Sequence, residues 1–250
     1  MLIRRVIAPA LEVNTYVLAA APGGPCVVVD PGGGAAERLP AVLEDLDLTV
    51  GAVLVTHGHP DHLWDSADVA DVADVVVQVA APDLDRLDDP AAARHVGEIL
   101  GGQFALLAGS PWRPPSQSGA IPAPVLEGGG AQVVPGIVAR GIPAPGHTSG
   151  STVLLVGATS GEAGIDAGAP GDPGHLPLPT AEPGAPVVLT GDVVFAGSVG
   201  RTDLPGGDPQ AMTETLRTLR QVLSPASILL PGHGPATTMA RELASNPFLR

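Results

Sequence analysis

The chain has 250 residues and a formal net charge of −14; 44% of its residues are hydrophobic, 2% are aromatic, and all twelve basic residues are arginine. This length is sufficient to bury a core of Val, Leu, Ile and Ala, and the acidic surface argues against nucleic acid or an anionic membrane as a partner. No stretch approaches the roughly 20 apolar residues of a membrane span, and the apolar N-terminal stretch breaks at Pro9, so we expect neither a membrane anchor nor a secretory signal.

Short β-rich runs and helical apolar spacings alternate along the chain. In chain order, the predicted elements are strand Thr15–Ala19, strand Cys26–Asp30, helix Ala35–Leu46, strand Ala52–Thr56, helix Trp64–Val72, strand Thr152–Val156, strand Val187–Thr190, helix Pro209–Leu223 and strand Ile228–Leu230. Asp208 is the predicted N-cap of the last helix, because Pro209 follows it. The pattern predicts an α/β fold made of two similar halves.

Two segments lack periodicity and are predicted to be loop insertions, over residues 101–130 and 157–186. The second would join strands Thr152–Val156 and Val187–Thr190. No linker separates the halves, so we expect a single domain over residues 1–250.

Cys26 is the only cysteine of the chain. An intramolecular disulfide is therefore excluded, which favours a cytoplasmic location. The thiol lies in the apolar run Cys26–Val29, where a buried strand residue is expected rather than a reactive nucleophile.

The densest chemical signal directly follows the strand Ala52–Thr56. His57, His59, Asp61 and His62 fall within six residues, separated by Gly58 and Pro60. Imidazole nitrogens and a carboxylate oxygen suit a borderline divalent metal, and the irregular turn can direct alternating side chains at one point. The cluster therefore predicts a metal site.

Three further positions beside predicted strands fit the same site. His147 precedes a strand in Pro-Gly-His-Thr, while Asp192 and His233 each follow one, in Thr-Gly-Asp and Pro-Gly-His-Gly-Pro. Strand ends on one edge of a sheet are where such ligands would be collected. His95 and His175 have no motif around them and are expected to be exposed or structural.

The ordered motifs THGHPDH, PGHTSGS, TGDVVF and PGHGP, together with Asp30-Pro31-Gly32, resemble the motif series of the metallo-β-lactamase superfamily. The resemblance implies an αββα sandwich, with two mixed β-sheets flanked by helices and metals at one edge. It makes His57, His59 and His147 ligands of one metal and Asp61, His62 and His233 ligands of a second, with Asp192 bridging. The implied cofactors are two divalent ions, zinc first, with iron or manganese as alternatives.

Such a site implies a hydrolase that uses a hydroxide bridging the metals, with Asp61 as the catalytic residue that orients it and moves its proton. A thiolate is a good leaving group, so a small-molecule thioester is the expected substrate. The segment that contains Gly200-Arg201-Thr202-Asp203 is similar to the glyoxalase II-like branch. Arg201 could bind a substrate carboxylate or form a salt bridge with Asp203, and both readings stay open. Tyr16 and Phe195 could flank the pocket or fill the core, and the core is the expected place for both.

Only 17 residues follow His233, so the helical domain with which glyoxalase II enzymes bind glutathione is not expected, and the thiol stays open. The nearest alternative is a persulfide dioxygenase with one iron. A lactamase and a nuclease of the same fold are less favoured, because neither an export signal nor a basic groove is evident. A non-catalytic metal-binding protein is the alternative from another class.

Overall fold

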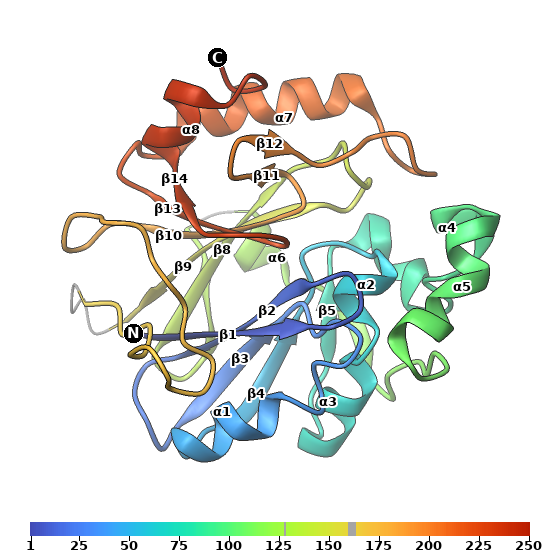
Figure 1. Ribbon diagram of the computed structural model, residues 1–250, viewed down its shortest axis with the longest axis horizontal. Coiled ribbons are helices and arrows are strands. Elements are labelled where there is room, and N and C mark those ends of the chain that lie inside the picture. The colour runs from blue at the N-terminus through green and yellow to red at the C-terminus, as the bar shows by residue number, and fades with distance from the viewer. Residues whose placement is uncertain (128, 160–163) are drawn as a thin grey trace.

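The computed structural model describes residues 1–127, 129–159 and 164–250. Two six-stranded sheets pack face to face, and helices cover the outer side of each (Figure 1). The predicted αββα sandwich is therefore confirmed.

The first sheet has the order β1-β2-β3-β4-β5-β6. Its strands are β1 (Leu2–Ala8), β2 (Val13–Ala19), β3 (Pro25–Val29), β4 (Thr49–Leu54), β5 (Val77–Val79) and β6 (Ser118–Ala120). β1, β2 and β3 pair antiparallel, whereas β3 to β6 pair parallel.

The second sheet has the order β14-β13-β10-β9-β8-β7. Its strands are β7 (Ala131–Val134), β8 (Ile137–Pro143), β9 (Thr152–Ala158), β10 (Val187–Gly191), β13 (Ile228–Pro231) and β14 (Thr237–Thr238). Only β10 and β13 pair parallel in it. A separate hairpin consists of β11 (Val194–Phe195) and β12 (Ser198–Val199).

Most helices lie outside the sheets, with those of the N-terminal half on the side of the first sheet and the last two on the second (Figure 1). The short helix Ala123–Leu126 instead packs against β8, with Val125 in the apolar cluster between the sheets. The helices are α1 (Leu39–Asp45), α2 (Pro60–Leu63), α3 (Ser66–Ala73), the 3₁₀ helix η1 (Ala81–Leu87), α4 (Ala93–Val96), α5 (Glu98–Ala108), α6 (Ala123–Leu126), α7 (Pro209–Val222) and α8 (Met239–Ser245). Among the described helices, none has the length and hydropathy that crossing a bilayer requires.

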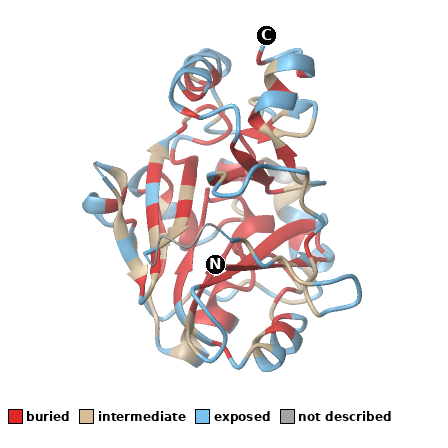
Figure 2. Cartoon of the chain, turned by 90° about the vertical axis from the view of Figure 1, so that its left-hand side faces the viewer, coloured by how far each residue is buried: buried red, intermediate tan, exposed pale blue. Residues whose placement is uncertain are grey.

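The strands are apolar on both faces because both faces are covered. In β10, Val187 and Leu189 face the core between the sheets, whereas Val188 packs in the cluster of α7 and α8. β13 repeats this alternation, which is the period of two that a strand imposes. Figure 2 shows buried residues along most strands, whereas β6 and β7 at the edges of the sheets are more exposed.

The six predicted strands all exist, within three residues of their predicted ends. The helix predicted over Pro209–Leu223 is α7, and the Asp208 side chain accepts hydrogen bonds from the N–H groups of Gln210 and Ala211 at its start. Cys26 is a fully buried strand residue, as predicted.

Two other predicted helices are shorter than expected. The helix predicted from Ala35 begins at Leu39, because the N–H groups of Gly34 and Ala36 bind the Asp65 carboxylate and hold the preceding residues in a turn. The helix predicted over Trp64–Val72 is α3, with the short α2 before it.

The prediction of a loop over residues 101–130 was wrong. α5 continues to Ala108, β6 pairs with β5, and α6 follows. Gly101 and Gly102 interrupt the helical pattern in the sequence, but fully buried Phe104 packs on Trp64, with ring centroids 4.7 Å apart, and this tertiary contact offsets the weak helix propensity. Residue 128 lies outside the described residues.

The segment 157–186 is mostly irregular, as predicted, although its first two residues extend β9 and residues 160–163 lie outside the described residues. Residues 164–174 lie along the outer edge of β1. Ile3 N–H donates to the Asp166 carbonyl at 2.8 Å and Arg5 N–H to the Gly174 carbonyl at 2.8 Å. The segment thereby covers an edge strand that would otherwise expose unpaired backbone groups.

Candidate metal centre

The candidate site lies where strand ends of both sheets meet. His57 follows β4, Asp192 follows β10 and His233 follows β13, while His147 lies in the turn between β8 and β9. β10 and β13 are parallel and β9 is antiparallel to β10, so these three positions share one edge of the second sheet. A hydrogen bond from Thr152 N–H to the Thr56 carbonyl, at 2.9 Å, joins that edge to the first sheet.

β2 adds a second connection between the sheets at this edge. The Tyr16 hydroxyl donates to the Pro231 carbonyl at 2.8 Å, and the Asn14 side-chain amide donates to the Pro231 and Gly234 carbonyls at 2.9 Å each. Tyr16 is 2% exposed, so its predicted core position is confirmed. These bonds fix the backbone on both sides of His233.

A first group of ligand atoms comes from His57, His59 and His147. His57 Nε2 lies 3.2 Å from His59 Nδ1, which lies 2.8 Å from His147 Nε2. Nitrogens that share a tetrahedral zinc at its usual bond length are about 3.3 Å apart, so the spacing is close to that of a metal triad. All three side chains are buried.

A second group comes from Asp61, His62 and His233. Asp61 Oδ2 lies 3.7 Å from His62 Nε2 and 3.3 Å from His233 Nε2. His62 is fully buried, whereas the His233 side chain is 29% exposed. This second group therefore faces the solvent side of the site.

The carboxylate of Asp192 lies between the two groups. Its Oδ1 is 3.2 Å from His62 Nε2, and its Oδ2 is 3.5 Å from both His147 Nε2 and His233 Nε2. Each of these three sets of donors can hold a metal ion: His57, His59 and His147; His57, His62 and Asp192; Asp61, His62 and His233. The structure thus brings together all seven side chains that the sequence predicted.

The contact between His62 and Asp192 tests whether the site fits a metal. Asp30 Oδ2 accepts a hydrogen bond from His62 Nδ1 at 3.0 Å, so neutral His62 carries its proton there and presents a lone pair at Nε2. That lone pair faces Asp192 Oδ1, and both atoms are buried without a hydrogen-bond partner among the described residues. Two facing acceptors repel unless a cation lies between them, so the geometry fits a metal ion.

The pKa values of the histidines fall into two classes. Burial, followed by repulsion from the neighbouring imidazoles, holds the pKa of His57 and of His59 well below the usual range, which keeps them neutral. Burial also opposes protonation of His62, but Asp192, Asp61 and Asp30 outweigh it and raise its pKa well above the usual range. Without a metal, a proton at His62 can therefore take the place of the cation.

The two carboxylates are ionised. Burial alone would raise the pKa of Asp61 and of Asp192, but nearby His62 and His233 lower both pKa values. The site therefore combines two negative charges with the neutral imidazoles of His57 and His59, and carboxylate and imidazole donors together suit divalent cations.

Several ligands are oriented by a second hydrogen bond. Besides His62, Asp30 accepts from the Thr56 N–H and hydroxyl, both at 2.7 Å. His147 Nδ1 donates to the Arg201 carbonyl at 2.7 Å. Such bonds fix the tautomer and the ring orientation of metal-binding histidines.

Sequence reasoning missed Asp83 in η1, which connects the two histidine loops. Its carboxylate is fully buried; Oδ2 accepts from Gly58 N–H at 2.8 Å and the Thr148 hydroxyl at 2.6 Å, and Oδ1 from Gly150 N–H at 2.8 Å. Gly58 lies between His57 and His59, and Thr148 follows His147. No sequence motif surrounds Asp83, so only the fold reveals this connection.

Four other side chains that the sequence singled out lie outside the group of seven ligands. Phe195 was expected in the core, but it is only half-buried and its ring centroid lies 6.1 Å from that of His233. Arg201 forms a bidentate ion pair with Asp203 at 2.6 and 2.7 Å, which agrees with the salt-bridge reading. His95 is buried and His175 donates to or accepts from no member of the cluster; its Nδ1 binds the Gly168 carbonyl.

Comparison with known proteins agrees with this geometry. The family model described as the metallo-beta-lactamase superfamily matches residues 8–233. The chain is 32% identical, over 89% of its length and 86% of the relative, to a protein of Haemophilus influenzae named hydroxyacylglutathione hydrolase GloC. Two crystal structures are each 27% identical: BLEG-1, titled a B3 metallo-beta-lactamase, with a TM-score of 0.71 and 99% of both chains covered, and TTHA1623 in a di-iron-bound form, with a TM-score of 0.69 and 98% and 99% covered.

Proposed function

Because this chain belongs to the metallo-β-lactamase superfamily, we propose that it is a binuclear metal-dependent hydrolase that cleaves thioesters. The observation that carries the proposal is the carboxylate of Asp192, which reaches His62 with one oxygen and His147 and His233 with the other. In that position Asp192 would serve both ligand groups, and each group of three side chains would hold one divalent ion.

In this account His57, His59 and His147 hold the first ion, and Asp61, His62 and His233 hold the second. Bound divalent ions lower the pKa of a water molecule held between them and polarise the carbonyl that it attacks. Zinc fits these nitrogen and carboxylate donors, and iron is an alternative that the di-iron form of a similar protein supports.

Asp61 is the proposed catalytic residue. Its contacts with His62 and His233 both use Oδ2. Oδ1 is then available to accept a hydrogen bond from the attacking water and to take up its proton. Ionised Asp61 is suited to this role because its pKa lies below the usual range for a carboxyl group, despite burial.

The composition of the chain supports a leaving group that needs little help from an acid. The chain has no lysine and one tyrosine, and the hydroxyl of that Tyr16 is bound to Pro231. A thiolate departs without protonation, because a thiol is far more acidic than an alcohol or an amine. The similarity to a protein named hydroxyacylglutathione hydrolase also supports a thioester, whereas the amine released from a lactam would need a proton.

The test combines metal analysis with hydrolysis of S-lactoyl thioesters in the same purified sample. We expect turnover that is lost in Asp61→Asn, with His175→Ala as a matched control outside the cluster. Uptake of oxygen with a persulfide substrate, by protein with one iron, would instead identify a persulfide dioxygenase. Metal-loaded protein that turns over no thioester, lactone or persulfide would overturn the enzymatic account.

A further inference from the structure

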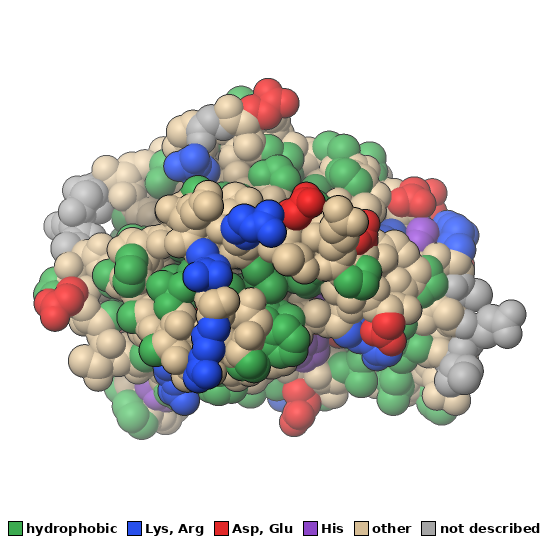
Figure 3. Space-filling view, turned by 90° about the horizontal axis from the view of Figure 1, so that it is seen from above, with side chains coloured by type: hydrophobic (Ala, Val, Ile, Leu, Met, Phe, Trp, Pro, Cys, Tyr) green, Lys and Arg blue, Asp and Glu red, His purple; other side chains and the backbone are tan. Residues whose placement is uncertain are grey.

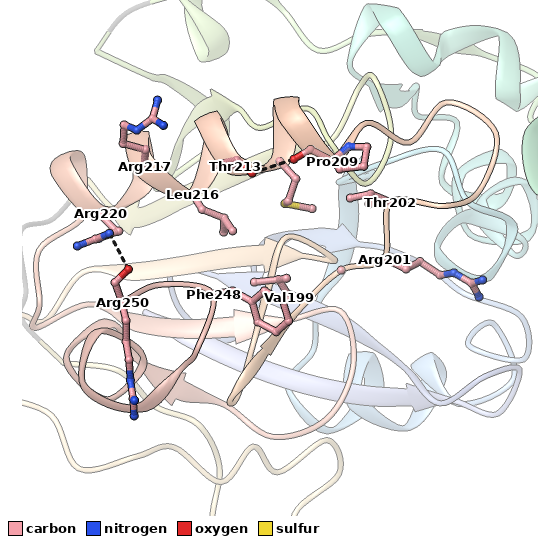
Figure 4. Close-up of a pocket in the computed structure, with 12 residues that line it drawn as sticks. Val199, Arg201, Thr202, Pro209, Thr213, Leu216, Arg217, Arg220, Phe248 and Arg250 are labelled. Carbon is pink, nitrogen blue, oxygen red and sulfur yellow. Dashed lines mark hydrogen bonds between the residues drawn. The ribbon is translucent and has the colours of Figure 1, made fainter.

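A cavity of about 590 Å³ lies between α7, β12 and the residues that follow α8. Figure 4 shows its walls: α7 on one side and the C-terminal residues on the other. The volume is within the range of roughly 300–1,000 Å³ that is typical of small-molecule sites. None of the seven residues of the candidate metal centre lines it.

The cavity gathers positive charge in an acidic protein. Arg217, Arg220 and Arg250 line it, three of the twelve arginines in a chain of net charge −14. Among the described residues, the arginines that form ion pairs with carboxylates are Arg4, Arg86, Arg113 and Arg201. Arg217 and Arg250 form no such pair among the described residues, whereas the Arg220 guanidinium lies 3.1 Å from the main-chain carboxyl oxygen of Arg250, the last residue of the chain. Figure 3 shows a row of arginine side chains on this face of the molecule.

Most of the hydrogen-bonding capacity of these arginines is available to a ligand. Arg220 donates one hydrogen bond to the main-chain carboxyl oxygen of Arg250 at 3.1 Å, and Arg250 donates one to the Ser245 carbonyl at 3.3 Å. A guanidinium has five N–H donors, so both retain free donors. In Figure 4, Arg217 and Arg220 lie one turn apart at the same end of the cavity, whereas Arg201 points away from it.

The rest of the cavity is apolar and includes an exposed aromatic ring. Met212 and Leu216 of α7 are buried behind it. Phe248 is 56% exposed at its wall, and it is the one exposed aromatic side chain among the six of this chain, all of which are described. Guanidinium groups next to an aromatic ring bind anions that also carry a flat apolar part.

The position of Phe248 is fixed by its neighbours. Leu249 is fully buried in the cluster of α7, and the Asn246 side-chain amide donates to the Ser198 carbonyl at 3.0 Å and to Glu242 Oε2 at 2.9 Å. The wall is therefore formed before a ligand binds, which reduces the entropy lost on binding.

We propose that this cavity binds a nucleoside phosphate. Arg217 and Arg220 would hold the phosphate groups, Arg250 would add charge, and the base would stack on Phe248 over Met212 and Leu216. A bare inorganic anion would leave the ring and the apolar wall unused, so the combined chemistry favours the nucleotide.

The cavity also has a direct connection to the metal centre. Gly200 and Arg201 line it, and the Arg201 carbonyl accepts the hydrogen bond of His147 Nδ1 at 2.7 Å. A nucleotide bound here is either a part of the thiol of a thioester substrate or a separate ligand. The first case rests on the proposed function. The two sources share the same chemistry, and competition with the substrate distinguishes them.

The test is calorimetric titration of the metal-loaded protein with ADP and, separately, with inorganic phosphate and adenosine. We expect Arg217→Ala/Arg220→Ala to weaken ADP binding at least about tenfold, since it removes both charged phosphate contacts. Phe248→Ala should weaken ADP about fivefold and leave phosphate unchanged, because stacking acts on the base alone. Arg140→Ala, an exposed arginine outside the cavity, is the matched control.

The outcomes separate the site from the proposed activity, because the titration needs no turnover. If ADP raises the KM for a thioester, the nucleotide belongs to the substrate. If ADP binds without competing with the thioester, it is a separate ligand. The proposal is overturned if ADP does not bind. It is also overturned if ADP binds equally well to the double arginine variant, as it would if it bound at the metals.

Discussion

His62 is held by carboxylates on both sides of its ring. Asp30 accepts a hydrogen bond from Nδ1, while Asp192 and Asp61 face Nε2 at 3.2 and 3.7 Å. Asp30 thereby leaves Nε2 of His62 free to bind a metal, although Asp30 is not itself a predicted ligand. Such partners fix the orientation and the tautomer of the ligand, and metal affinity depends on them.

Asp30→Asn should therefore lower the affinity for the metals by about 10- to 100-fold. The new amide N–H₂ would face two donors, Thr56 Oγ1 and His62 Nδ1, where the carboxylate accepts from both. Competition against a chromophoric chelator measures the change. Asp172→Asn, on the exposed surface, is the control, and equal affinities for the two variants would contradict the role of Asp30.

Cys26 offers a test of the buried first sheet. Burial raises the pKa of the Cys26 thiol to about 12. The folded protein keeps the thiol protonated, whereas the unfolded chain loses the proton near pH 8.5. Stability from this difference is present below pH 8.5 and is lost as pH rises toward 12. Alkylation by iodoacetamide at pH 8.5 should therefore be slow until denaturant is added, and rapid reaction of the folded protein would contradict this burial.

The ligands were predictable from the sequence because their motifs are local. Asp61 and His62 stand beside His57 and His59, and the Gly and Pro residues around the other ligands mark strand ends. Asp83 was not predictable, because it acts on Gly58, Thr148 and Gly150, which lie 25 to 67 residues away. Only the packing of η1 between two loops brings these groups together.

The 3₁₀ helix η1 connects the loop of His57 and His59 to the loop of His147 through the Asp83 carboxylate. Asp83→Ala would leave the Gly58 and Gly150 N–H groups buried without an acceptor and Arg86 without its ion pair, so we expect a loss of about 3–5 kcal/mol in the free energy of unfolding. Urea unfolding of the metal-free protein measures it.

Asp85→Ala is the matched control, because Asp85 belongs to the same 3₁₀ helix and its side chain is 65% exposed. Its effect should stay within about 0.5 kcal/mol. A similar loss for both variants would mean that η1, rather than the Asp83 carboxylate, is responsible.

The N-terminus of α7 depends on its cap. The Asp208 side chain accepts from Gln210 and Ala211 N–H, and its own N–H donates to the Gly146 carbonyl beside His147. Asp208→Ala should cost about 1 kcal/mol of unfolding free energy by urea titration, the usual value for a cap. Glu214→Ala, at an exposed position within the same helix, should be close to neutral, and an equal loss there would argue against the cap.

Elements with clear periodicity or capping were predictable, whereas those that depend on tertiary contacts were not. α7 combines a cap, an N-terminal proline and a helical stripe. β1 escaped prediction because Arg4 and Arg5 interrupt its apolar pattern, yet the Arg4 guanidinium is buried and donates to the Asp166 carbonyl at 2.7 Å. α5 escaped because of its paired glycines.

Four apolar clusters of buried side chains join the layers of the molecule. The cluster between the two sheets contains residues of both, among them Leu54 of β4 and Leu189 of β10. We therefore expect the chain to unfold as a single unit, with equal calorimetric and van 't Hoff enthalpies. Two separate transitions in scanning calorimetry would instead indicate halves that fold independently.

The segment 157–186 lies away from the metal edge. It pairs with β1 near Leu2, whereas β2 reaches His233 at Val13, opposite the other end of β1. The segment follows β1 as far as Arg5, and three residues of strand, about 10 Å, separate Arg5 from the end at Ala8. Its contribution is therefore to cover the sheet, and the entrance to the site is formed by other residues, with Phe195 beside His233.

The most direct test of the account is the metal content of the purified protein, measured by mass spectrometry for the natural chain and for Asp192→Ala and His233→Ala. We predict about two equivalents of zinc, or of zinc and iron, in the natural chain, about one in His233→Ala, and a loss at both positions in Asp192→Ala. One equivalent of iron in the natural chain, unchanged in His233→Ala and unchanged by added zinc, would contradict the two-metal site.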